Sequence, residues 1–342
     1  MVNVLITGGS GFVGARLARE LLAAGSIEAG GQAAQPISQL TLVDRAPLPP
    51  DLAANPAVTG IEGDLLDLLS PGGNGLDATV AADVIFHLAA AVSAECESDF
   101  DLGIRANLRA TEALLVAARS AETHPLLVFS SSVAAFGDSP DHPLPEVVDD
   151  QTAPNPQTSY GVQKVICEQL VADYSRKGYL RGRTVRLMTV CVRPGKPNAA
   201  ASGFMSGIIR EPLAGQRAVC PVTPDTGVVL SSPANTIRGL LRAASADEAA
   251  WGGRSAVNLP AVNITIGAMA EALEQVAGPE TTALIDWKPD PAIQQMVSTW
   301  PGRLRADRAA RLGLAPDPDF RSIITQHIAE TRPAEGRPAE TR

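Results

Sequence analysis

The chain has 342 residues, of which 45% are hydrophobic and 19% charged, so it is long enough and apolar enough to form a sizeable core. Its 28 basic and 37 acidic side chains give a net charge of −9, which argues against a main role in nucleic-acid binding. It has no apolar run of the roughly 18 residues that span a bilayer, no signal-peptide pattern and no Cys-x-x-Cys pair, which predicts a cytoplasmic protein with no membrane partner and no metal site.

In the first half of the chain, short apolar runs rich in β-branched residues alternate with stretches of helical spacing. Continuous apolar strands separated by helices of this length are typical of a parallel sheet that helices cover on both faces. We therefore predict an α/β fold, a Rossmann-type doubly wound parallel sheet with a smaller C-terminal substrate lobe. The predicted strands are Val2–Thr7, Leu40–Asp44, Val84–Leu88, Leu126–Ser130 and Thr184–Val190, and the predicted helices are Phe12–Ala24, Gly103–Ser120 and Ser159–Arg176.

The predicted domain organisation follows from where this alternation stops. Residues 1–190 form the expected Rossmann-type domain, which includes an insertion of small residues at Gly25–Pro36. Beyond residue 190 prolines interrupt the pattern, so we expect 191–330 to form mainly the substrate lobe, with some elements returning to the main domain. Residues 331–342 repeat Arg-Pro-Ala-Glu without an apolar face, which predicts a disordered tail.

The first chemical signal is the run TGGSGFVG, residues 7–14, which links the first predicted strand to the first predicted helix. Gly8 permits a tight turn, Gly11 lets the backbone approach a pyrophosphate, and Gly14 lets the helix pack closely on the strand. The start of the helix also offers free N–H groups and a positive dipole end to phosphates. The motif therefore predicts a dinucleotide site; the alternative is a glycine-rich turn without a ligand.

Two acidic residues end or follow the next strands, where they can contact the adenosine half of a dinucleotide. Asp44 can accept hydrogen bonds from the ribose hydroxyls and repels a 2′-phosphate, which favours NAD over NADP, although the adjacent Arg45 weakens that discrimination. Asp64 can contact the adenine edge, with Leu65 packing on the ring. The alternative for both carboxylates is a turn residue, since Asp44 stands shortly before Pro47.

The second chemical signal is the pair Tyr160 and Lys164, which lie four residues apart and therefore share one helix face. A free phenol is a poor base at neutral pH. A nearby ammonium and the positive nicotinamide ring stabilise the phenolate form, and Lys164 can also hold the ribose hydroxyls. Upstream, the serine run 130–132 ends a strand where hydroxyls can meet a substrate oxygen. Each signal alone also arises by chance, but their order along one alternating chain favours an enzyme.

Together these motifs resemble the extended short-chain dehydrogenase/reductase superfamily, also called the nucleotide-sugar epimerase/dehydratase group. TGGSGFVG, the two aspartates, HLAA, FSSSVAAFGD and YGVQK occur in the family's order over most of residues 1–190. The resemblance implies NAD as the cofactor, Ser132 as the hydroxyl that polarises the substrate oxygen, Tyr160 as the acid/base and Lys164 as its cationic partner. Phe136 replaces a tyrosine that epimerases often place near the sugar. The implied cofactor-binding residues are Gly8, Gly11, Phe12, Val13, Gly14, Asp44, Asp64, Leu65, Leu88, Ala89, Ala90, Asn107, Tyr160 and Lys164.

A second resemblance concerns the distal half of the chain. Residues 185–202 and 208–215 look like the corresponding segments of D-erythronate dehydrogenases, and the Tyr-Gly-Pro turn of sugar-nucleotide enzymes is absent. This resemblance implies NAD-dependent oxidation of the 2-hydroxyl of a small aldonic acid, D-erythronate, to the 2-oxo acid. The alternatives are a nucleotide-sugar epimerase or dehydratase with tightly held NAD, and a non-catalytic dinucleotide sensor of the same fold.

A sugar acid needs a cation for its carboxylate and polar groups for its hydroxyls. Arg186 and Arg193 lie on either side of the end of a predicted strand, and the carboxyl ends of strands border the ligand crevice in this fold. We expect one of them to bind the carboxylate and prefer Arg193, in the loop; the alternative is that both are solvated surface cations. The predicted substrate-binding residues are Ser93, Ser132, Tyr160, Arg186 and Arg193.

The helices predicted at 103–120 and 159–176 carry alanine and leucine on more than one face. One apolar stripe is enough to cover the sheet, so the surplus apolar surface indicates a partner. We therefore expect a homodimer in which two helices from each subunit pack around a two-fold axis.

Overall fold

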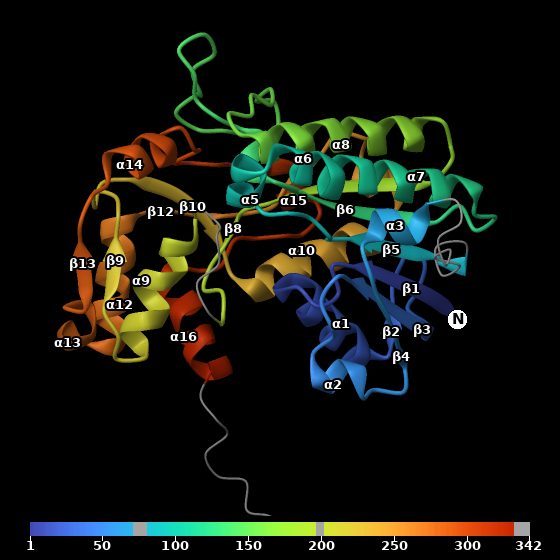
Figure 1. The fold of residues 1–342 in the computed structure, drawn as a ribbon, viewed down its shortest axis with the longest axis horizontal. Helices are drawn as coiled ribbons and strands as arrows, with labels where there is room; N and C mark the ends of the chain where they lie inside the picture. The colour runs from blue at the N-terminus through green and yellow to red at the C-terminus, as the bar shows by residue number, and fades with distance from the viewer. Residues whose placement is uncertain (71–80, 196–201, 332–342) are drawn as a thin grey trace, which may run out of the picture.

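The computed structural model describes residues 1–70, 81–195 and 202–331. Of the predicted tail, residues 332–342 lie outside this range, as do residues 196–201 of the distal segment. Figure 1 shows two lobes: a larger one built on a central sheet and a smaller one that contains β9, β13, α9 and α12.

The main sheet has eight strands, and every neighbouring pair is parallel except β2 with β3. From one edge the order is β11, β7, β6, β5, β1 and β3, and β3 also pairs with β4. The order reverses between β1 and β5, and ligands bind outside the carboxyl ends of strands at such a switch point. The strands are β1 (Val2–Thr7), β2 (Ser26–Ile27), β3 (Gln35–Asp44), β4 (Val58–Glu62), β5 (Val84–His87), β6 (Leu126–Ser132), β7 (Arg181–Leu187) and β11 (Val257–Asn258).

Helices cover both faces of this sheet, which confirms the predicted doubly wound α/β fold (Figure 1). Side chains alternate along a strand, so in β1 Val4 and Ile6 pack in one apolar core with α1 and α10, whereas Leu5 packs in another with α7 and α8. The helices of the main lobe are α1 (Phe12–Ala24), α2 (Pro50–Ala53), α3 (Leu65–Leu69), α5 (Ser93–Ser98), α6 (Phe100–Gly103), α7 (Ala110–Ser120), α8 (Ser159–Arg176), α10 (Pro233–Ser245), α11 (Glu248–Trp251) and α15 (Asp307–Arg311).

Two of the three predicted helices have the observed bounds, Phe12–Ala24 and Ser159–Arg176. The helix predicted at 103–120 is longer and irregular, because a π-helical turn, Ile104–Arg109, joins α6 to α7. β3 begins at Gln35, inside the predicted insertion, and is therefore longer than its apolar core at 40–44 indicates.

The strand predicted at 184–190 is two strands. β7 ends at Leu187 in the main sheet, and β8 (Thr189–Val190) pairs with β10 (Gly227–Ser231) in a second sheet. A continuous apolar pattern does not reveal this break, because both halves are buried in their own sheets. The chain thus passes from the main sheet to the smaller lobe at Met188.

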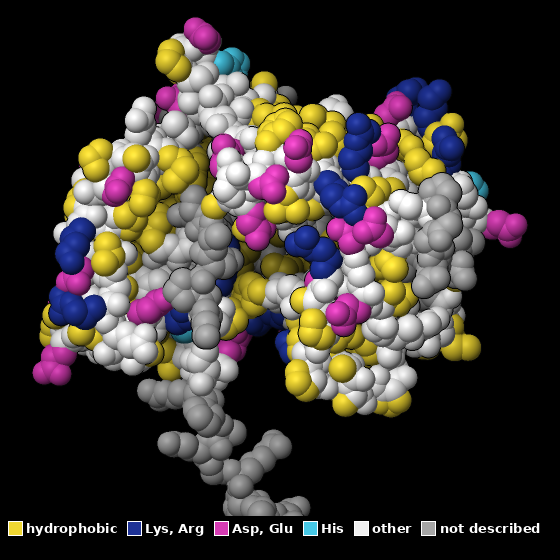
Figure 2. Space-filling model, viewed as in Figure 1, with side chains coloured by type: hydrophobic (Ala, Val, Ile, Leu, Met, Phe, Trp, Pro, Cys, Tyr) yellow, Lys and Arg dark blue, Asp and Glu magenta, His cyan; other side chains and the backbone are white. Residues whose placement is uncertain are grey.

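The smaller lobe packs helices against two short sheets around its own apolar core. Residues after 190 also return to the main lobe, where α10 packs on the main sheet and β11 pairs with β7. Figure 2 shows the surface hollowed between the two lobes. The remaining elements are β9 (Ala218–Cys220), β12 (Val262–Thr265), β13 (Ile285–Trp287), α9 (Gly203–Leu213), α12 (Ile266–Ala277), α13 (Pro279–Thr282), α14 (Pro291–Ser298), α16 (Phe320–Thr331) and the 3-10 turn at Val133–Ala135.

Candidate active site

The glycine-rich turn between β1 and α1 leaves no room for side chains. Gly8 has a φ of +76°, and its amide donates to Val43 O at 2.8 Å. A Cβ on Gly8 would lie 2.7 Å from Ala89 N, and one on Gly14 would lie 2.0 Å from Gly8 O. No side chain caps the start of α1, so its first N–H groups remain available for an anion. The turn therefore has the geometry that a pyrophosphate requires.

A first cavity of about 290 Å³ extends from this turn over the ends of β3 and β4. Asp44 stands at its edge, where its carboxylate accepts from Ser10 N at 2.9 Å and from Ala46 N at 3.1 Å. Asp64 caps α3 by accepting from Leu66 N, also at 2.9 Å. Both predicted adenosine contacts thus lie at one cavity, each fixed by backbone N–H groups. Its lining includes Gly8, Gly11, Asp44, Arg45, Asp64, Leu65, Leu88, Ala89 and Ala90.

A second cavity of about 370 Å³ shares the glycine turn with the first and runs to the ends of β6 and β7. It brings the start of α1 and the side chains of Ser132, Tyr160 and Lys164 to one space. The two cavities form one elongated site with phosphate-binding geometry in its middle, which suits a dinucleotide. The lining of the second cavity includes Gly8, Gly11, Phe12, Val13, Gly14, Leu88, Ala90, Ser132, Tyr160, Lys164 and Arg193.

Backbone contacts hold Lys164 and Ser132 in place. Lys164 is 3% exposed, and its Nζ donates to Ser130 O at 2.8 Å and lies 5.6 Å from the centre of the Tyr160 ring. The Ser132 hydroxyl accepts from Ala134 N at 3.1 Å, which leaves its own hydrogen free to be donated. The predicted catalytic trio, Ser132, Tyr160 and Lys164, therefore meets at one end of the second cavity.

The start of α8 is held tightly against the end of β6. Thr158 caps the helix by accepting from Gly161 N at 3.1 Å. A Cβ on Gly161 would lie 2.2 Å from Ala134 O, so the glycine after Tyr160 allows the helix to approach the loop that follows Ser132. This close approach brings the phenol and the serine hydroxyl to the same cavity.

A third and smaller cavity, of about 130 Å³, lies on the far side of the trio from the glycine turn. It contains the predicted substrate residues Ser93, Ser132, Tyr160 and Arg193. Its other lining residues are Val92, Val133, Ala134, Thr158, Met188, Thr189, Ser202, Trp300 and Pro301.

Arg193 is the cation of this third cavity. Its Nε donates to Val190 O at 3.1 Å and its Nη2 to Ser202 Oγ at 3.3 Å, and no carboxylate in the described part of the chain pairs with it. Burial lowers the pKa of the Arg193 guanidinium, and nearby Cys191 and Tyr160 partly offset that shift. A half-buried cation without a carboxylate partner is suited to an anionic ligand.

The structure does not bring Arg186 to any of the three cavities. Its guanidinium makes two bonds to the Glu168 carboxylate, at 2.8 and 2.7 Å, and lies 4.7 Å from the centre of the Phe136 ring. Both partners are buried. Asn107 is buried too; it accepts from Ala91 N at 2.7 Å and so supports the loop after β5 from behind.

Several lining residues of the third cavity carry no motif in the sequence. Thr158 lies two residues before Tyr160, and Thr189 follows the end of β7. This proximity to predicted features was the only sequence signal that they line the cavity. Trp300 and Pro301 come from the far end of the chain, and no spacing rule connects them to the serine and tyrosine.

In residues 1–70, 81–195 and 202–331, no cluster of three or more His, Cys, Asp or Glu side chains is placed to bind a metal ion. Over the same residues, no helix has both the length and the hydrophobicity that crossing a membrane requires.

Comparisons with known proteins place the chain among proteins of one family. A model of the NAD dependent epimerase/dehydratase family matches residues 4–228. The chain is 45% identical over 332 residues to a D-erythronate dehydrogenase of Cupriavidus necator, covering 96% of this chain and 98% of that one. It is 40% identical over 328 residues to a D-erythronate dehydrogenase of Haemophilus influenzae, covering 96% and 99%. A crystal structure described as the nucleoside-diphosphate-sugar epimerase from Agrobacterium tumefaciens matches with a TM-score of 0.87 and 40% identity, over 96% of this chain and 94% of that one.

Proposed function

The chain belongs to the NAD-dependent epimerase/dehydratase family, and we propose that it is an NAD-dependent dehydrogenase that oxidises the 2-hydroxyl of D-erythronate to the 2-oxo acid. Two relatives that match almost the whole chain are D-erythronate dehydrogenases. The predicted family and enzyme class are thereby confirmed.

The observation that carries the proposal is the third cavity, where Ser132 and Tyr160 line the same small space as Arg193. At about 130 Å³ it is well below the roughly 300–1,000 Å³ of typical ligand pockets, so it suits a small molecule. A 2-hydroxy acid places its carboxylate one bond from the carbon that is oxidised. With Arg193 beside Ser132 and Tyr160, the cavity can therefore bind the carboxylate and the C2 hydroxyl of such a substrate at the same time.

The chain's own residues divide the work of the reaction. Arg193 binds the carboxylate, and the Ser132 hydroxyl donates to the oxygen on C2. Tyr160, as the phenolate, accepts the hydroxyl proton. The positive charge of Lys164, which its hydrogen bond to Ser130 O holds in place, stabilises that phenolate. NAD, when bound, supplies the nicotinamide ring that accepts the hydride from C2.

The cofactor residues follow from the first two cavities. The glycines at 8, 11 and 14 and the start of α1 hold the pyrophosphate, and Asp44 binds the adenosine ribose. Asp64 and Leu65 border the adenine, and Lys164 reaches the nicotinamide ribose. We propose that Asn107 supports cofactor binding indirectly, because its side chain holds the Ala91 backbone at the edge of both cavities.

The main alternative is a nucleotide-sugar epimerase, and one structural relative carries such a description. That reaction needs room for a sugar and a nucleotide beyond the nicotinamide. The small third cavity and the replacement of the usual tyrosine by Phe136, which packs in the core beneath Arg186, favour the small acid.

The test is an absorbance assay of NADH with purified enzyme. The proposal predicts net NADH formation with NAD and D-erythronate, and none with a UDP-sugar. Conversion of a UDP-sugar without net NADH, and no reaction with three- to six-carbon aldonates, would establish the epimerase instead.

We also propose that the chain is a cytoplasmic homodimer. Leu114, Leu115 and Val171 are buried in the chain's own core, but Val116, Val162 and Ile166 are exposed on α7 and α8, which lie side by side (Figure 1). Exposed apolar side chains on two adjacent helices are consistent with a partner surface. Light scattering at micromolar concentration is expected to give twice the mass of one 35.5 kDa chain, and a mass of one chain would contradict the dimer.

A further inference from the structure

Trp300 is the largest side chain that lines the third cavity. Most of the other lining side chains are small: alanine, serine, threonine, valine and proline. The indole is rigid, whereas Met188 is flexible and can repack around a ligand. The shape of the cavity on that side therefore depends mainly on where the backbone places Trp300.

Hydrogen bonds hold the backbone on the N-terminal side of Trp300 in place. Trp300 N donates to Val297 O at 3.0 Å, at the end of α14. Thr299 O accepts from Asp138 N at 2.8 Å, which ties this segment to the long loop between β6 and α8. That loop also leads to Thr158 and Tyr160, so one connection supports two sides of the cavity.

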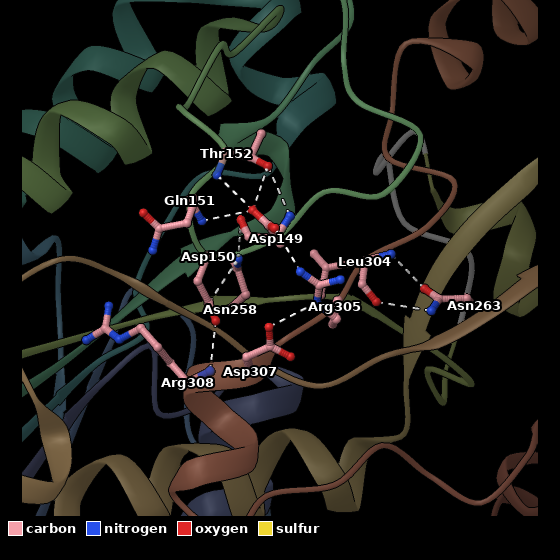
Figure 3. Close-up of polar contacts among 10 residues, drawn as sticks. All are labelled: Asp149, Asp150, Gln151, Thr152, Asn258, Asn263, Leu304, Arg305, Asp307 and Arg308. Atoms are coloured by element: carbon pink, nitrogen blue, oxygen red, sulfur yellow. Dashed lines mark hydrogen bonds and ion pairs between the residues drawn. The ribbon is translucent and has the colours of Figure 1, made fainter.

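The backbone on the C-terminal side is fixed by more contacts, which Figure 3 shows in part. Asn263, in β12, accepts from Leu304 N at 2.9 Å and donates to Leu304 O at 3.1 Å. Val148 N donates to Arg303 O at 3.0 Å, and Arg305 N donates to Val148 O at 2.9 Å. Backbone and side-chain bonds from two separate segments, β12 and the loop at Val148, therefore hold residues 303–305.

Ionic contacts extend this support (Figure 3). Arg305 pairs with Asp149 at 3.1 Å, and Arg308 N donates to Asp150 at 2.7 Å. Gly302 lies so close to the start of β10 that a Cβ on Gly227 would be 3.3 Å from its Cα. With both flanks held, Trp300 has little freedom to withdraw when a larger ligand enters.

We propose that Trp300 sets the upper limit on the chain length of the acid, so that a four-carbon aldonate is accepted and five- and six-carbon aldonates are rejected. This inference rests on the proposed function. Arg193 fixes the carboxylate, and Ser132 and Tyr160 fix the oxygen on C2, so carbons 3 and beyond extend toward the rest of the lining. The largest and most rigid part of that lining is the indole.

The experiment compares kcat/KM for D-erythronate with kcat/KM for five- and six-carbon aldonates in three variants. One methylene in a pocket is worth roughly 10- to 200-fold in selectivity. Trp300→Ala is therefore expected to shift the ratio at least about tenfold toward the longer acids, and Trp300→Phe to shift it less in the same direction. Trp287→Ala is the matched control, because that tryptophan is 38% exposed on β13 and lines none of the three cavities.

The outcomes separate the two proposals. A parent enzyme that oxidises no aldonate contradicts the proposed function. A parent that oxidises D-erythronate, with a ratio unchanged in both Trp300 variants, contradicts the role of Trp300 alone. The melting temperature and NAD affinity of each variant are measured alongside. If Trp300→Ala fails to fold, Trp300→Phe still tests the inference, since the smaller ring alone must raise kcat/KM for the five-carbon acid relative to D-erythronate.

Discussion

Tyr160, Lys164 and Ser132 are held by different neighbours, so each can be changed without moving the others. Lys164 is bound to the backbone of β6, Ser132 to the backbone of the turn that follows it, and Tyr160 stands in the first turn of α8. The acid/base step, the binding of the substrate oxygen and the support of the phenolate can therefore be tested separately.

Tyr160→Phe removes only the phenol oxygen. The ring still packs at the start of α8, so we expect an unchanged melting temperature and an unchanged affinity for NAD. Loss of the general base is expected to lower kcat by about 10²- to 10⁴-fold. Steady-state kinetics with D-erythronate measures this; a kcat within a few-fold of the parent would mean that another group accepts the proton.

In the parent, the Asp44 carboxylate accepts hydrogen bonds from Ser10 N and Ala46 N. Asp44→Asn removes the charge but keeps one oxygen that can accept from one of these two amides. Because the carboxylate no longer repels a 2′-phosphate, we expect the preference for NAD over NADP to fall at least about tenfold, roughly 1.4 kcal/mol. The ratio of kcat/KM for the two cofactors is the readout. An unchanged ratio would show that ribose recognition lies elsewhere.

Arg193→Met keeps an unbranched side chain of similar length but removes the cation. Truncating one partner of a buried, hydrogen-bonded charge pair costs about 2–5 kcal/mol, so we expect KM for D-erythronate to rise roughly 30-fold or more, with NAD affinity unchanged. Arg217→Met is the control, because Arg217 is exposed in the smaller lobe and pairs with Asp286. Equal KM values in the parent and Arg193→Met would mean that other groups bind the carboxylate.

The residues that could be predicted from the sequence are those whose roles follow from local spacing. The glycines at 8, 11 and 14 and the pair Tyr160 and Lys164 each lie within one turn or helix. Which of Arg186 and Arg193 is available to a substrate depends on Glu168, which pairs with Arg186 from another element. Trp300 is brought to the cavity by backbone contacts with distant segments. Such long-range pairings leave no periodic signal.

At the scale of elements, α8 carries the proposed acid/base Tyr160 and its partner Lys164, and an ion pair joins this helix to the sheet. Tyr160, Lys164 and Glu168 stand four residues apart, so all three lie along one helix face. Glu168 binds Arg186 of β7 and also accepts from the Ser131 hydroxyl of β6. The pair therefore sets how α8 lies on the two strands that end beside the cavity.

Glu168→Gln leaves the Arg186 cation buried without its counter-charge. Breaking a buried pair from one side typically costs about 3–5 kcal/mol of unfolding free energy, whereas replacing both partners by apolar residues costs much less. We expect Glu168→Gln and Arg186→Met each to lower the stability measured by urea denaturation, and Glu168→Leu combined with Arg186→Met to recover part of the loss. Single variants as stable as the parent would contradict this role of the pair.

The bounds of a helix or strand could be predicted where its apolar residues pack in a single part of the fold. They could not be predicted where an apolar run passes from the main sheet to the second sheet. The predicted bounds of α1 and α8 match the observed ones, and each helix has one buried face, at residues 14–21 in α1 and 161–171 in α8. The strand predicted at 184–190 spans the passage from the main sheet to the smaller lobe, and burial on both sides of Met188 hides the break.

At the scale of the whole molecule, the proposed site draws on residues at the border of both lobes. The residues proposed to bind the cofactor lie in the main lobe, whereas Arg193 and Trp300 come from segments that border the smaller lobe. Arg16 of α1 pairs with Glu330 of α16 through two bonds of 2.7 Å and so joins the lobes on another side. The third cavity, near where the chain first leaves the main sheet, is thus placed for a substrate that must reach the nicotinamide.

In the proposed reaction the hydride leaves C2 of D-erythronate, so D-erythronate deuterated at C2 reveals whether this step occurs. With this substrate and NAD, we expect one deuterium in each reduced cofactor, detected by mass spectrometry, and formation of the unlabelled 2-oxo acid in equal amount. Reduced cofactor without deuterium, or no reduced cofactor at all, would rule out hydride transfer from C2.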